Sequence, residues 1–159
     1  DGGHFDKVCS YLGKGQADGA KLLLGGEAIG NAYVQPTIFD GVAAADTIAQ
    51  EEIFGPVLSV ITVSNFDQAI EVANTTSYGL AASVFTANVK KAHRAARAIR
   101  AGTVTVNCYG EGDITTPFGG YKQSGFGGRD NGLHAHDQYT EVKTIWIDLS
   151  DRSGEEAVA

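Results

Sequence analysis

Methionine is absent from this 159-residue chain, and cysteine, proline and basic residues are scarce. Since translation starts on methionine, we expect the chain not to be an unprocessed translation product and to enter a fold already under way. Its two cysteines, Cys9 and Cys108, have no Cys-x-x-Cys spacing and no clustered histidines, which argues against a zinc site and a disulfide framework. We therefore expect a reducing, cytoplasmic setting and no bound metal.

Positive charge is also in short supply. The chain has 12 Lys and Arg against 19 Asp and Glu, a net charge of −7. Because nucleic-acid backbones demand a basic face, we expect no nucleic-acid partner. No apolar run approaches the roughly 18 residues of a membrane-spanning helix. No signal peptide is visible either, so no membrane partner is expected.

Glycine, in contrast, is abundant, with 21 residues, nearly twice the usual share of about 7%. The glycines concentrate between 110 and 132, which predicts a loop-rich region there. Elsewhere the apolar periodicity predicts regular elements. A helix is expected from the stripe Phe5, Val8, Cys9 and Leu12, ended by the glycines Gly13, Gly15 and Gly19. Strands are expected at 21–24, 33–39, 57–63, 80–86, 103–107 and 142–149. One helix is expected from the apolar stripe at 66–73, capped by Asn65 and Gln68 and ended by Gly79, and another at 89–99.

From residue 57 onward the order of these elements is β-α-β-α-β, which implies parallel strands joined by right-handed crossovers. We predict an α/β fold: a partial doubly wound parallel sheet with helices on both faces, then a Gly-rich loop and a C-terminal strand. In this division residues 1–141 form the folded part and 142–150 the terminal strand. Residues 151–159 are polar and small, and we expect a flexible tail there.

The Gly-rich segment from Tyr109 to Gly132 follows the strand expected at 103–107. In open α/β sheets, ligands bind beyond the carboxyl ends of the strands. Two interpretations stay open: the loop lines a pocket with Phe118 as an apolar wall, or it is a structural surface loop. Its glycine spacing matches neither a phosphate-binding loop nor the dinucleotide fingerprint Gly-x-Gly-x-x-Gly.

The sequence EEIFGP at 51–56 places two carboxylates next to an aromatic residue and a proline turn. A carboxylate can accept two hydrogen bonds from a ribose diol, and an aromatic ring can pack against a nicotinamide. The alternative is a pair of solvated glutamates at a turn, which is the commoner fate of glutamate. The segment alone does not decide between them.

Three further side chains suggest chemistry only weakly. His134 and His136 lack a nearby third ligand, so solvated or locally hydrogen-bonded histidines are the simpler interpretation than a metal site. Cys108 follows a strand without a neighbouring histidine in sequence, which favours inert packing over a nucleophile.

Several motifs occur in the order found in one known family. The matching segments are FDKV (5–8), QPTIF (35–39), EEIFGPV (51–57), PFGGYKQSG (117–125) and YTEVKTIWI (139–147). The chain resembles the C-terminal part of the catalytic domain in the aldehyde dehydrogenase superfamily, from about residue 4 to about residue 149. The stretch 112–130 is most similar to aminoaldehyde oxidisers, in particular γ-glutamyl-γ-aminobutyraldehyde dehydrogenases.

The resemblance implies roles for individual residues. Glu52 corresponds to the residue that holds the nicotinamide ribose, and Phe54 to the aromatic residue beside the nicotinamide. Lys7 lies where family members contact the adenosine ribose of NAD or NADP, and His4 occupies a neighbouring position that is commonly Gln. Phe118 resembles an aromatic residue that lines the aldehyde tunnel.

The resemblance also implies a division of the chemistry. In the family a cysteine thiolate attacks the aldehyde, and a side-chain amide and a backbone N–H hold the oxyanion. Hydride passes to NAD or NADP, and a glutamate activates the water that releases the acid. Both the nucleophile and that general base lie upstream, in motifs absent here. No catalytic residue is therefore expected in this chain, which should be inactive alone.

Substrate preference is expected at the tunnel mouth. Where the family usually has a bulky residue before Phe118, this chain has Gly112, flanked by Glu111 and Asp113. We expect a roomy, acidic mouth that accepts aminated aldehydes. In the complete enzyme, Glu111→Gln should weaken binding of an aminoaldehyde and spare a neutral aliphatic one.

The last strand is expected to serve assembly. The segment that begins at Val142 and ends at Leu149 resembles the family strand that leaves its own subunit and extends the sheet of a neighbour, which implies a homo-oligomer. An apolar edge strand without such a partner would be an aggregation hazard. Two other functions stay open: a non-catalytic assembly module and a small-molecule-binding module. The main expectation is that Glu52, Phe54 and Phe118 converge around a space for nicotinamide and aldehyde.

Overall fold

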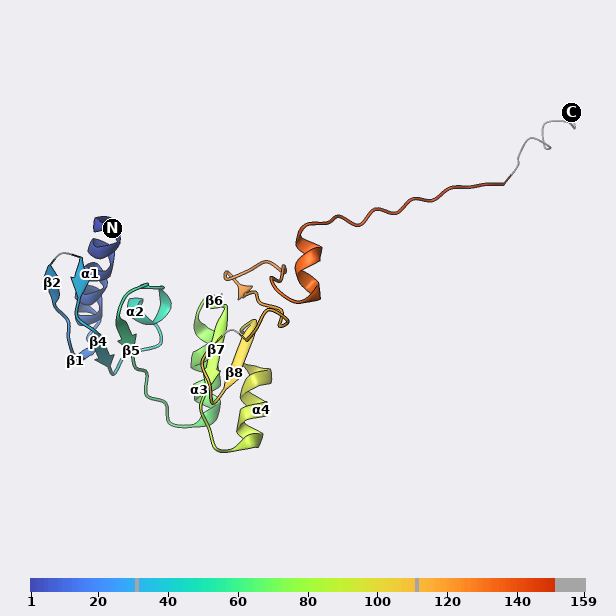
Figure 1. Cartoon of the computed structure of the whole chain (residues 1–159). Coiled ribbons are helices and arrows are strands. Elements are labelled where there is room, and N and C mark those ends of the chain that lie inside the picture. Colours follow the sequence, from blue (N-terminus) through green and yellow to red (C-terminus); the bar gives the residue numbers. More distant parts are fainter. Residues whose placement is uncertain (31, 111, 151–159) are drawn as a thin grey trace, which may run out of the picture.

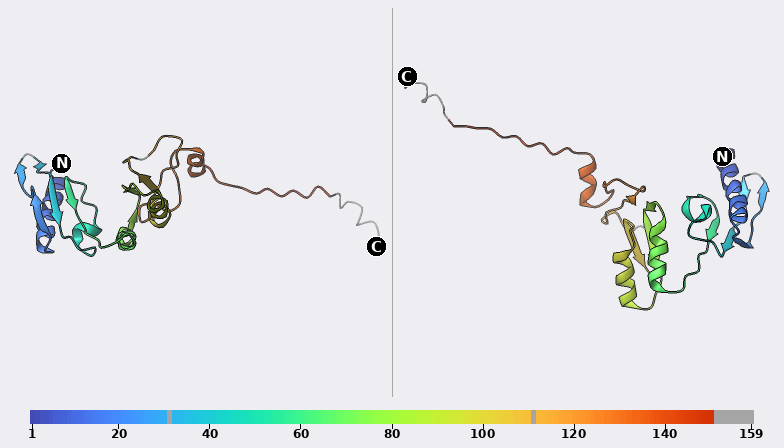
Figure 2. Two further views of the ribbon diagram at one scale, coloured as in Figure 1. Left: turned by 90° about the horizontal axis from the view of Figure 1, so that it is seen from below. Right: turned by 180° about the vertical axis from the view of Figure 1, so that it is seen from behind.

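The computed structural model describes residues 1–30, 32–110 and 112–150 (Figure 1). They form two lobes joined by the segment 60–65, and beyond the second lobe the chain runs outward as an extended segment (Figures 1 and 2). The first lobe contains α1 (Gly2–Ala17), β1 (Lys21–Leu24), β2 (Ala28–Gly30), β3 (Tyr33–Val34), β4 (Thr37–Asp40), α2 (Thr47–Gln50) and β5 (Val57–Ser59). The second contains α3 (Phe66–Thr75), β6 (Tyr78–Gly79), β7 (Ala81–Val84), α4 (Val89–Ala98), β8 (Thr103–Val106), β9 (Tyr121–Lys122) and the 3-10 helix η1 (Leu133–Gln138).

Helix α1 starts at a side-chain cap and ends just before Gly19. The Asp1 carboxylate accepts a hydrogen bond from the His4 backbone N–H at 2.9 Å, which satisfies one of the open donors of the first turn. The helix continues through Gly13 and Gly15 to Ala17, so of the three glycines expected to end it only Gly19, with φ of 93°, lies at its end. At Gly15 an added Cβ would lie 3.0–3.1 Å from side-chain atoms of β4 and α2, so glycine lets α1 pack closely on them.

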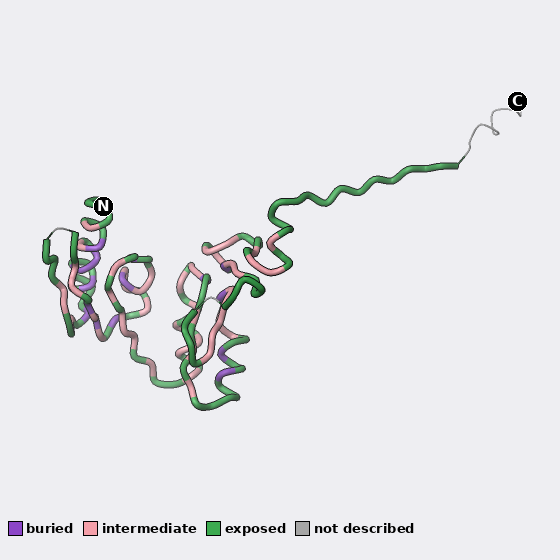
Figure 3. The backbone as a smooth tube through the Cα atoms, in the orientation of Figure 1, coloured by how far each residue is buried: buried purple, intermediate pink, exposed green. Residues whose placement is uncertain are grey.

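The first lobe holds the main apolar core. Strand β4 lies at the centre of a three-stranded sheet, antiparallel to β1 and parallel to β5. Phe39 and Thr37 of β4 are its most completely buried side chains. Figure 3 shows buried positions on α1, β4 and α2 around this centre. The buried cluster is Val8, Tyr11, Leu12, Ala20, Phe39, Val42, Ile48 and Ile53.

The second lobe pairs two helices with two parallel strands. Strands β7 and β8 are in register from Ala81↔Thr103 to Val84↔Val106, as the sequence predicts for parallel neighbours. Asn65 caps α3 by accepting from the Gln68 backbone N–H at 2.9 Å. The Gln68 side chain accepts from the backbone N–H of Ser64 instead of Asn65, so the expected capping box is displaced by one residue.

The mixed α/β character is confirmed, but the three strands expected from residue 57 do not form one sheet. Strand β5 ends at Ser59 and pairs with β4, whereas β7 pairs only with β8. Residues 60–63, which complete the strand predicted at 57–63, form no regular element. Strand β5 pairs with β4 inside the first lobe, and the segment 60–65 then carries the chain to the second lobe. Strands β7 and β8 therefore form a separate sheet there.

The C-terminal segment 142–149 is extended but is not assigned as a strand. A strand is defined by hydrogen bonds to a neighbour, and this segment runs away from both lobes (Figures 1 and 2). Its apolar side chains are exposed, Trp146 to 90%. The tail predicted at 151–159 lies outside the described residues.

Candidate functional site

Helix α1 holds the segment 51–55, which connects α2 to β5. The Tyr11 hydroxyl donates to a carboxylate oxygen of Glu51 at 2.7 Å, and Lys14 Nζ lies 3.6 Å from the same oxygen. The hydrogen bond from Tyr11, reinforced by the positive charge of Lys14, holds the pKa of the Glu51 carboxyl below its ordinary value. The same hydrogen bond raises the pKa of the Tyr11 phenol. The Glu51 carboxylate is therefore already engaged by side chains of α1.

Glu52 differs from its neighbour. Its side chain is exposed, and no hydrogen bond or ion pair joins its carboxylate to any residue that the structure describes. Its backbone carbonyl accepts a long hydrogen bond from Lys7 Nζ at 3.4 Å. Of the two adjacent glutamates, Glu52 is the one whose carboxylate is available for a ligand, the same residue that the family resemblance singles out.

Phe54 has an unusual backbone and an open side chain. Its φ of 54° lies in the left-handed region, which a non-glycine residue adopts at an energetic cost. The ring is 72% exposed, so packing inside the chain does not account for it. The Phe54 carbonyl accepts a hydrogen bond from His4 Nε2 at 2.7 Å, which helps to hold this conformation. Such strain is typical of ligand sites.

The lobe of α1 has a small hollow of about 270 Å³ beside these residues. Its lining includes His4, Val8, Tyr33 and Phe54. Three of the sequence-predicted cofactor residues thus lie near one another: Lys7 contacts the backbone of Glu52, and Phe54 is two positions further. The structure brings this set together.

Phe118 lies in the other lobe. Its backbone N–H and carbonyl both bond to Asp130 at 2.7 Å, which closes an isolated β-bridge within the Gly-rich loop. With Tyr109, Gly112 and residues of β7, it lines a hollow of about 590 Å³. The lining includes Leu80 and Ala81, at the start of β7, and no residue of β8, so the hollow lies beside β7 and not beyond the carboxyl end of β8, where the sequence predicted a pocket.

Gly112 and Asp113, predicted at the tunnel mouth, are both held by contacts within their own loop. Gly112 has φ of 86°, and an added Cβ would lie 2.4 Å from the Thr116 hydroxyl, so glycine fits the local backbone. The Asp113 carboxylate accepts from both the backbone N–H and the hydroxyl of Thr115, and these bonds hold its pKa below the ordinary value. Asp113 thus stays charged and turned to its own loop. Glu111 lies outside the described residues.

Close approach of backbone segments accounts for several of the glycines in and around the Gly-rich loop. A Cβ on Gly102 would lie 1.7 Å from the Gly119 carbonyl oxygen, and one on Gly79 would lie 2.5 Å from the Arg100 oxygen. Lys122 donates to the carbonyls of Asn74 and Thr76 at the carboxyl end of α3. The motif at 117–125 therefore fastens the loop onto β6 and α3, a structural task that sequence reasoning did not separate from pocket lining.

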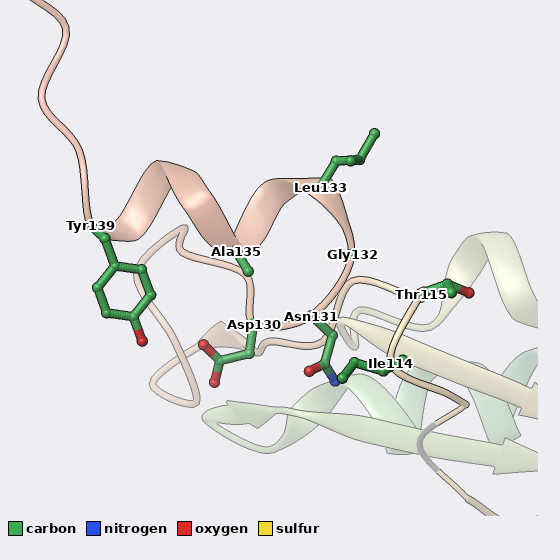
Figure 4. Close-up of a pocket in the computed structure, with 8 residues that line it drawn as sticks. All are labelled: Ile114, Thr115, Asp130, Asn131, Gly132, Leu133, Ala135 and Tyr139. Atoms are coloured by element: carbon green, nitrogen blue, oxygen red, sulfur yellow. The ribbon is translucent and has the colours of Figure 1, made fainter.

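A larger hollow of about 950 Å³ lies between η1 and the Gly-rich loop. Figure 4 shows Leu133 and Tyr139 near the two ends of η1, with Asp130 and Asn131 between them. The Asp130 carboxylate already accepts from Gln138 Nε2 at 2.7 Å. Ile114, Thr115 and the residues 130–132 of its lining belong to the Gly-rich segment for which the sequence left pocket lining open. The contribution of Leu133, Ala135 and Tyr139 was not indicated by any motif.

The predicted cofactor and substrate residues do not meet. Phe54 lines the hollow beside α1, and Phe118 lines hollows of the second lobe, and no pocket found among the described residues contains both. The chain therefore presents two separate half-sites. The expected convergence of Glu52, Phe54 and Phe118 is not formed by the described residues.

The remaining candidates carry no assembled chemistry. Cys9 is half-buried and Cys108 is exposed, and neither thiol is hydrogen-bonded to a described residue. His134 Nδ1 lies 3.8 Å from Asp137, and both side chains are exposed. Within residues 1–30, 32–110 and 112–150 no group of three or more His, Cys, Asp or Glu could hold a metal ion. In the same ranges no helix has the length and apolarity to cross a membrane.

Comparison with known proteins adds a family context to this geometry. The sequence model of the aldehyde dehydrogenase family matches residues 1–145. Aminoacetaldehyde dehydrogenase of Pseudomonas aeruginosa is 54% identical over 147 residues, which cover 92% of this chain and 30% of that protein. The NADP/NAD-dependent aldehyde dehydrogenase PuuC of Escherichia coli is 48% identical over 149 residues, 94% of this chain and 30% of that protein.

A solved structure of similar sequence shares the fold. A mutant of the P. syringae indole-3-acetaldehyde dehydrogenase AldA, in complex with NAD+ and IAA, superposes with a TM-score of 0.87 at 57% identity. The match covers 94% of this chain and 31% of that one. The chain thus spans about three tenths of the length of the relatives it matches.

Proposed function

The chain belongs to the aldehyde dehydrogenase family, and we propose that it is the C-terminal part of the catalytic domain of an enzyme that oxidises an aldehyde to its acid with NAD or NADP. The observation that carries this proposal is the contrast between the two adjacent glutamates. Glu51 is bonded to α1, whereas the Glu52 carboxylate is exposed and unpaired among the described residues, beside the exposed ring of Phe54.

These residues fit one end of a dinucleotide. The free carboxylate of Glu52 can accept hydrogen bonds from a ribose diol, and the Phe54 ring offers a flat apolar surface to a nicotinamide. When bound, the nicotinamide takes up the hydride that leaves the aldehyde carbon. We propose Lys7 for the adenosine ribose on the strength of the family resemblance alone, since its amine here donates to the Glu52 carbonyl at 3.4 Å.

The second lobe supplies a wall for the aldehyde. Phe118 and Tyr109 line the hollow of about 590 Å³ beside β7, together with Gly110 and Gly112. Water is kept from the reacting carbon by such apolar walls once the site is closed. The two half-sites need the rest of the catalytic domain to join them, and the family nucleophile and general base belong to that part.

The first test is whether the chain alone has activity. The isolated 159-residue chain, mixed with NAD+ or NADP+ and an aldehyde, should give no increase in absorbance from reduced cofactor. The same residues within the complete enzyme should give turnover. Turnover by the isolated chain at enzyme-like rates would contradict the assignment and would point to Cys9 or Cys108 as a nucleophile.

We further propose that the substrate is an aminoaldehyde. Identity of 54% to an aminoacetaldehyde dehydrogenase supports this choice, and so do the acidic residues Glu111 and Asp113 around Gly112. Identity of 57% to an indole-3-acetaldehyde dehydrogenase favours an aromatic aldehyde as the second candidate. The value of kcat/KM for a short aminoaldehyde should exceed that for an aromatic acetaldehyde. The reverse ratio would favour the second candidate.

Assembly of a homo-oligomer through 142–149 is also proposed, in a cytoplasmic enzyme without nucleic-acid or membrane partners. The segment exposes Val142, Ile145, Trp146, Ile147 and Leu149, and pairing with a neighbouring sheet would cover such side chains. Sedimentation of the complete enzyme with and without residues 142–149 tests this. A wild-type monomer would exclude the proposal. A purely structural assembly module would assemble in the same way without binding NAD+ or NADP+.

A further inference from the structure

One face of α1 carries polar side chains that reach the segment 51–55. Positions separated by three or four residues lie on the same face of a helix. Four residues with the spacing three, four and three fall on this face, and each contacts the segment 51–55. They are His4, Lys7, Tyr11 and Lys14.

The first two contacts fix the backbone of the segment. His4 Nε2 donates to the carbonyl of Phe54 at 2.7 Å, and Lys7 Nζ donates to that of Glu52 at 3.4 Å. Both acceptors are main-chain atoms, so these bonds depend little on the residue types in the segment. They determine where the chain runs relative to α1.

The other two contacts fix a side chain. The Tyr11 hydroxyl donates to Glu51 Oε2 at 2.7 Å, and Lys14 Nζ approaches the same oxygen to 3.6 Å. Lys14 Nζ also lies 4.4 Å from the centre of the Tyr11 ring, at the distance of a cation–π contact. Tyr11 itself is buried, so its hydroxyl stands in a defined position from which Glu51 can be held.

Fixing Glu51 also determines the direction of Glu52. Glu51 has an extended backbone, with φ of −109° and ψ of 144°. In an extended chain successive side chains point to opposite sides. Glu51 is turned to α1 and Ile53, two positions on, is buried in the core, so Glu52 between them is turned outward.

We infer that Tyr11 and Glu51 are positioning residues of the cofactor site, which hold the segment 51–55 so that Glu52 faces the ribose and Phe54 faces the nicotinamide. The inference deepens the proposed function and rests on it. It assigns a task to the first glutamate of EEIFGP that differs from the task of the second: Glu51 binds the protein, and Glu52 binds the ligand.

The test uses the complete enzyme with the variants Tyr11→Phe and Glu51→Ala. Dissociation constants for NAD+ and NADP+ are measured by calorimetric titration in the absence of aldehyde. Loss of one hydrogen bond to a charged group should weaken binding of the preferred cofactor by about tenfold. The KM for the aldehyde should stay within about twofold, since Phe118 lies in the other lobe. Glu51→Gln keeps an oxygen for the Tyr11 hydroxyl and should recover part of the affinity.

Ser10→Ala is the matched control. It also removes one hydroxyl from α1, but Ser10 donates to the Lys7 carbonyl within the helix and does not contact the segment 51–55. Its cofactor affinity should equal that of the wild type. Glu51 is exposed, so the Glu51 variants keep the test valid even if Tyr11→Phe fails to fold.

The outcomes separate the two claims. Wild-type affinity in both Tyr11→Phe and Glu51→Ala would overturn the positioning role while the proposed function stands. Equal losses for cofactor and aldehyde, together with a lower Tm, would also overturn it, because they indicate general destabilisation. A wild-type enzyme that binds neither NAD+ nor NADP+ would overturn the proposed function and this inference together.

Discussion

Asn107 and Thr86 exchange two hydrogen bonds across the ends of two parallel strands. The Asn107 side-chain oxygen accepts from the Thr86 backbone N–H at 2.8 Å, and its amide nitrogen donates to the Thr86 carbonyl at 3.0 Å. The pair closes the carboxyl ends of β7 and β8 at the point where the chain turns toward Tyr109. Tyr109, two residues beyond Asn107, lines the hollow that also contains Phe118, so this pair fixes the start of the segment that leads to it.

Asn107 gives the first prediction. Asn107→Gly removes both hydrogen bonds and should lower the free energy of unfolding by about 2 kcal/mol. Asn107→Ala should cost about 1 kcal/mol more, because Asn107 has φ of 54° and alanine is strained there. Urea unfolding of both variants measures the difference. Equal stability of the two variants would show that alanine adopts the positive φ at position 107, or leaves it, without an energetic cost.

Gly102 gives the second prediction. A Cβ at this position would lie 1.7 Å from the Gly119 carbonyl oxygen, and neither backbone can move freely. Gly102→Ala should therefore lower the free energy of unfolding by about 3 kcal/mol. Gly13→Ala is the control, since nothing lies within 4 Å of its Cβ position in α1, and it should raise stability by about 0.5–1 kcal/mol. A harmless Gly102→Ala would contradict the close packing of the Gly-rich loop.

The third prediction concerns Lys122. Its ammonium group donates to the carbonyls of Asn74 and Thr76, at 3.0 and 2.9 Å, and so satisfies acceptors at the carboxyl end of α3. Lys122→Met should lower the free energy of unfolding by about 2 kcal/mol. Lys90→Met, on the exposed face of α4, should change it by less than about 0.5 kcal/mol. Thermal unfolding compares the two, and similar Tm values would exclude the anchoring role.

The fourth prediction is a pH dependence of stability from Tyr11 and Glu51. Folding lowers the pKa of Glu51, so its contribution is present above the ordinary glutamate pKa and is lost as the pH falls through the lowered value. Folding raises the pKa of Tyr11, so its contribution is present below about pH 10 and is lost as the pH rises through the raised value.

Urea midpoints across the acidic and alkaline ranges test this dependence. Tyr11→Phe should be less pH dependent than the wild type at both ends, because it removes the phenol and the hydrogen bond that perturbs Glu51. Parallel curves for the two proteins would show that the Tyr11–Glu51 bond does not contribute in solution.

The fifth prediction separates ligand binding from packing. Phe54 is 72% exposed, so Phe54→Ala should change the free energy of unfolding by less than about 0.5 kcal/mol. In the complete enzyme the same change should weaken cofactor binding severalfold, since the ring is expected to face the nicotinamide. Phe39→Ala is the contrast, because Phe39 is fully buried and its loss should cost about 3–5 kcal/mol. A large stability loss in Phe54→Ala would assign the ring to packing.

Local signals in the sequence predicted local structure well. The helices α3 and α4 and the strands β7 and β8 lie within a few residues of the expected ranges, because their caps and apolar periods act over short distances. The pairing of β5 with β4 was not predicted, since nothing in the run 57–63 specifies its neighbour. The sequence did not separate Gly13 and Gly15, which lie inside α1, from Gly19 at its end, because the close packing of Gly15 against Phe39 exists only in the folded chain.

The candidate site shows the same limit. The motif EEIFGP indicated a cofactor residue, but only the contact between Tyr11 and Glu51 distinguishes the two glutamates. The Gly-rich loop was left open between pocket lining and structure, and it does both: Phe118 lines a hollow, and Gly102 and Lys122 fasten the loop. Contacts between residues forty or more positions apart leave no trace in a single sequence.

The only tryptophan of the chain, Trp146, stands on the extended segment that leaves both lobes. Indole fluorescence of the isolated chain therefore originates at one site, away from either half of the proposed catalytic surface. Any surface that covers the segment would shift that emission to shorter wavelength, whereas events in the lobes would leave its colour unaltered. The emission of Trp146 thus reports on whatever covers the segment 142–149.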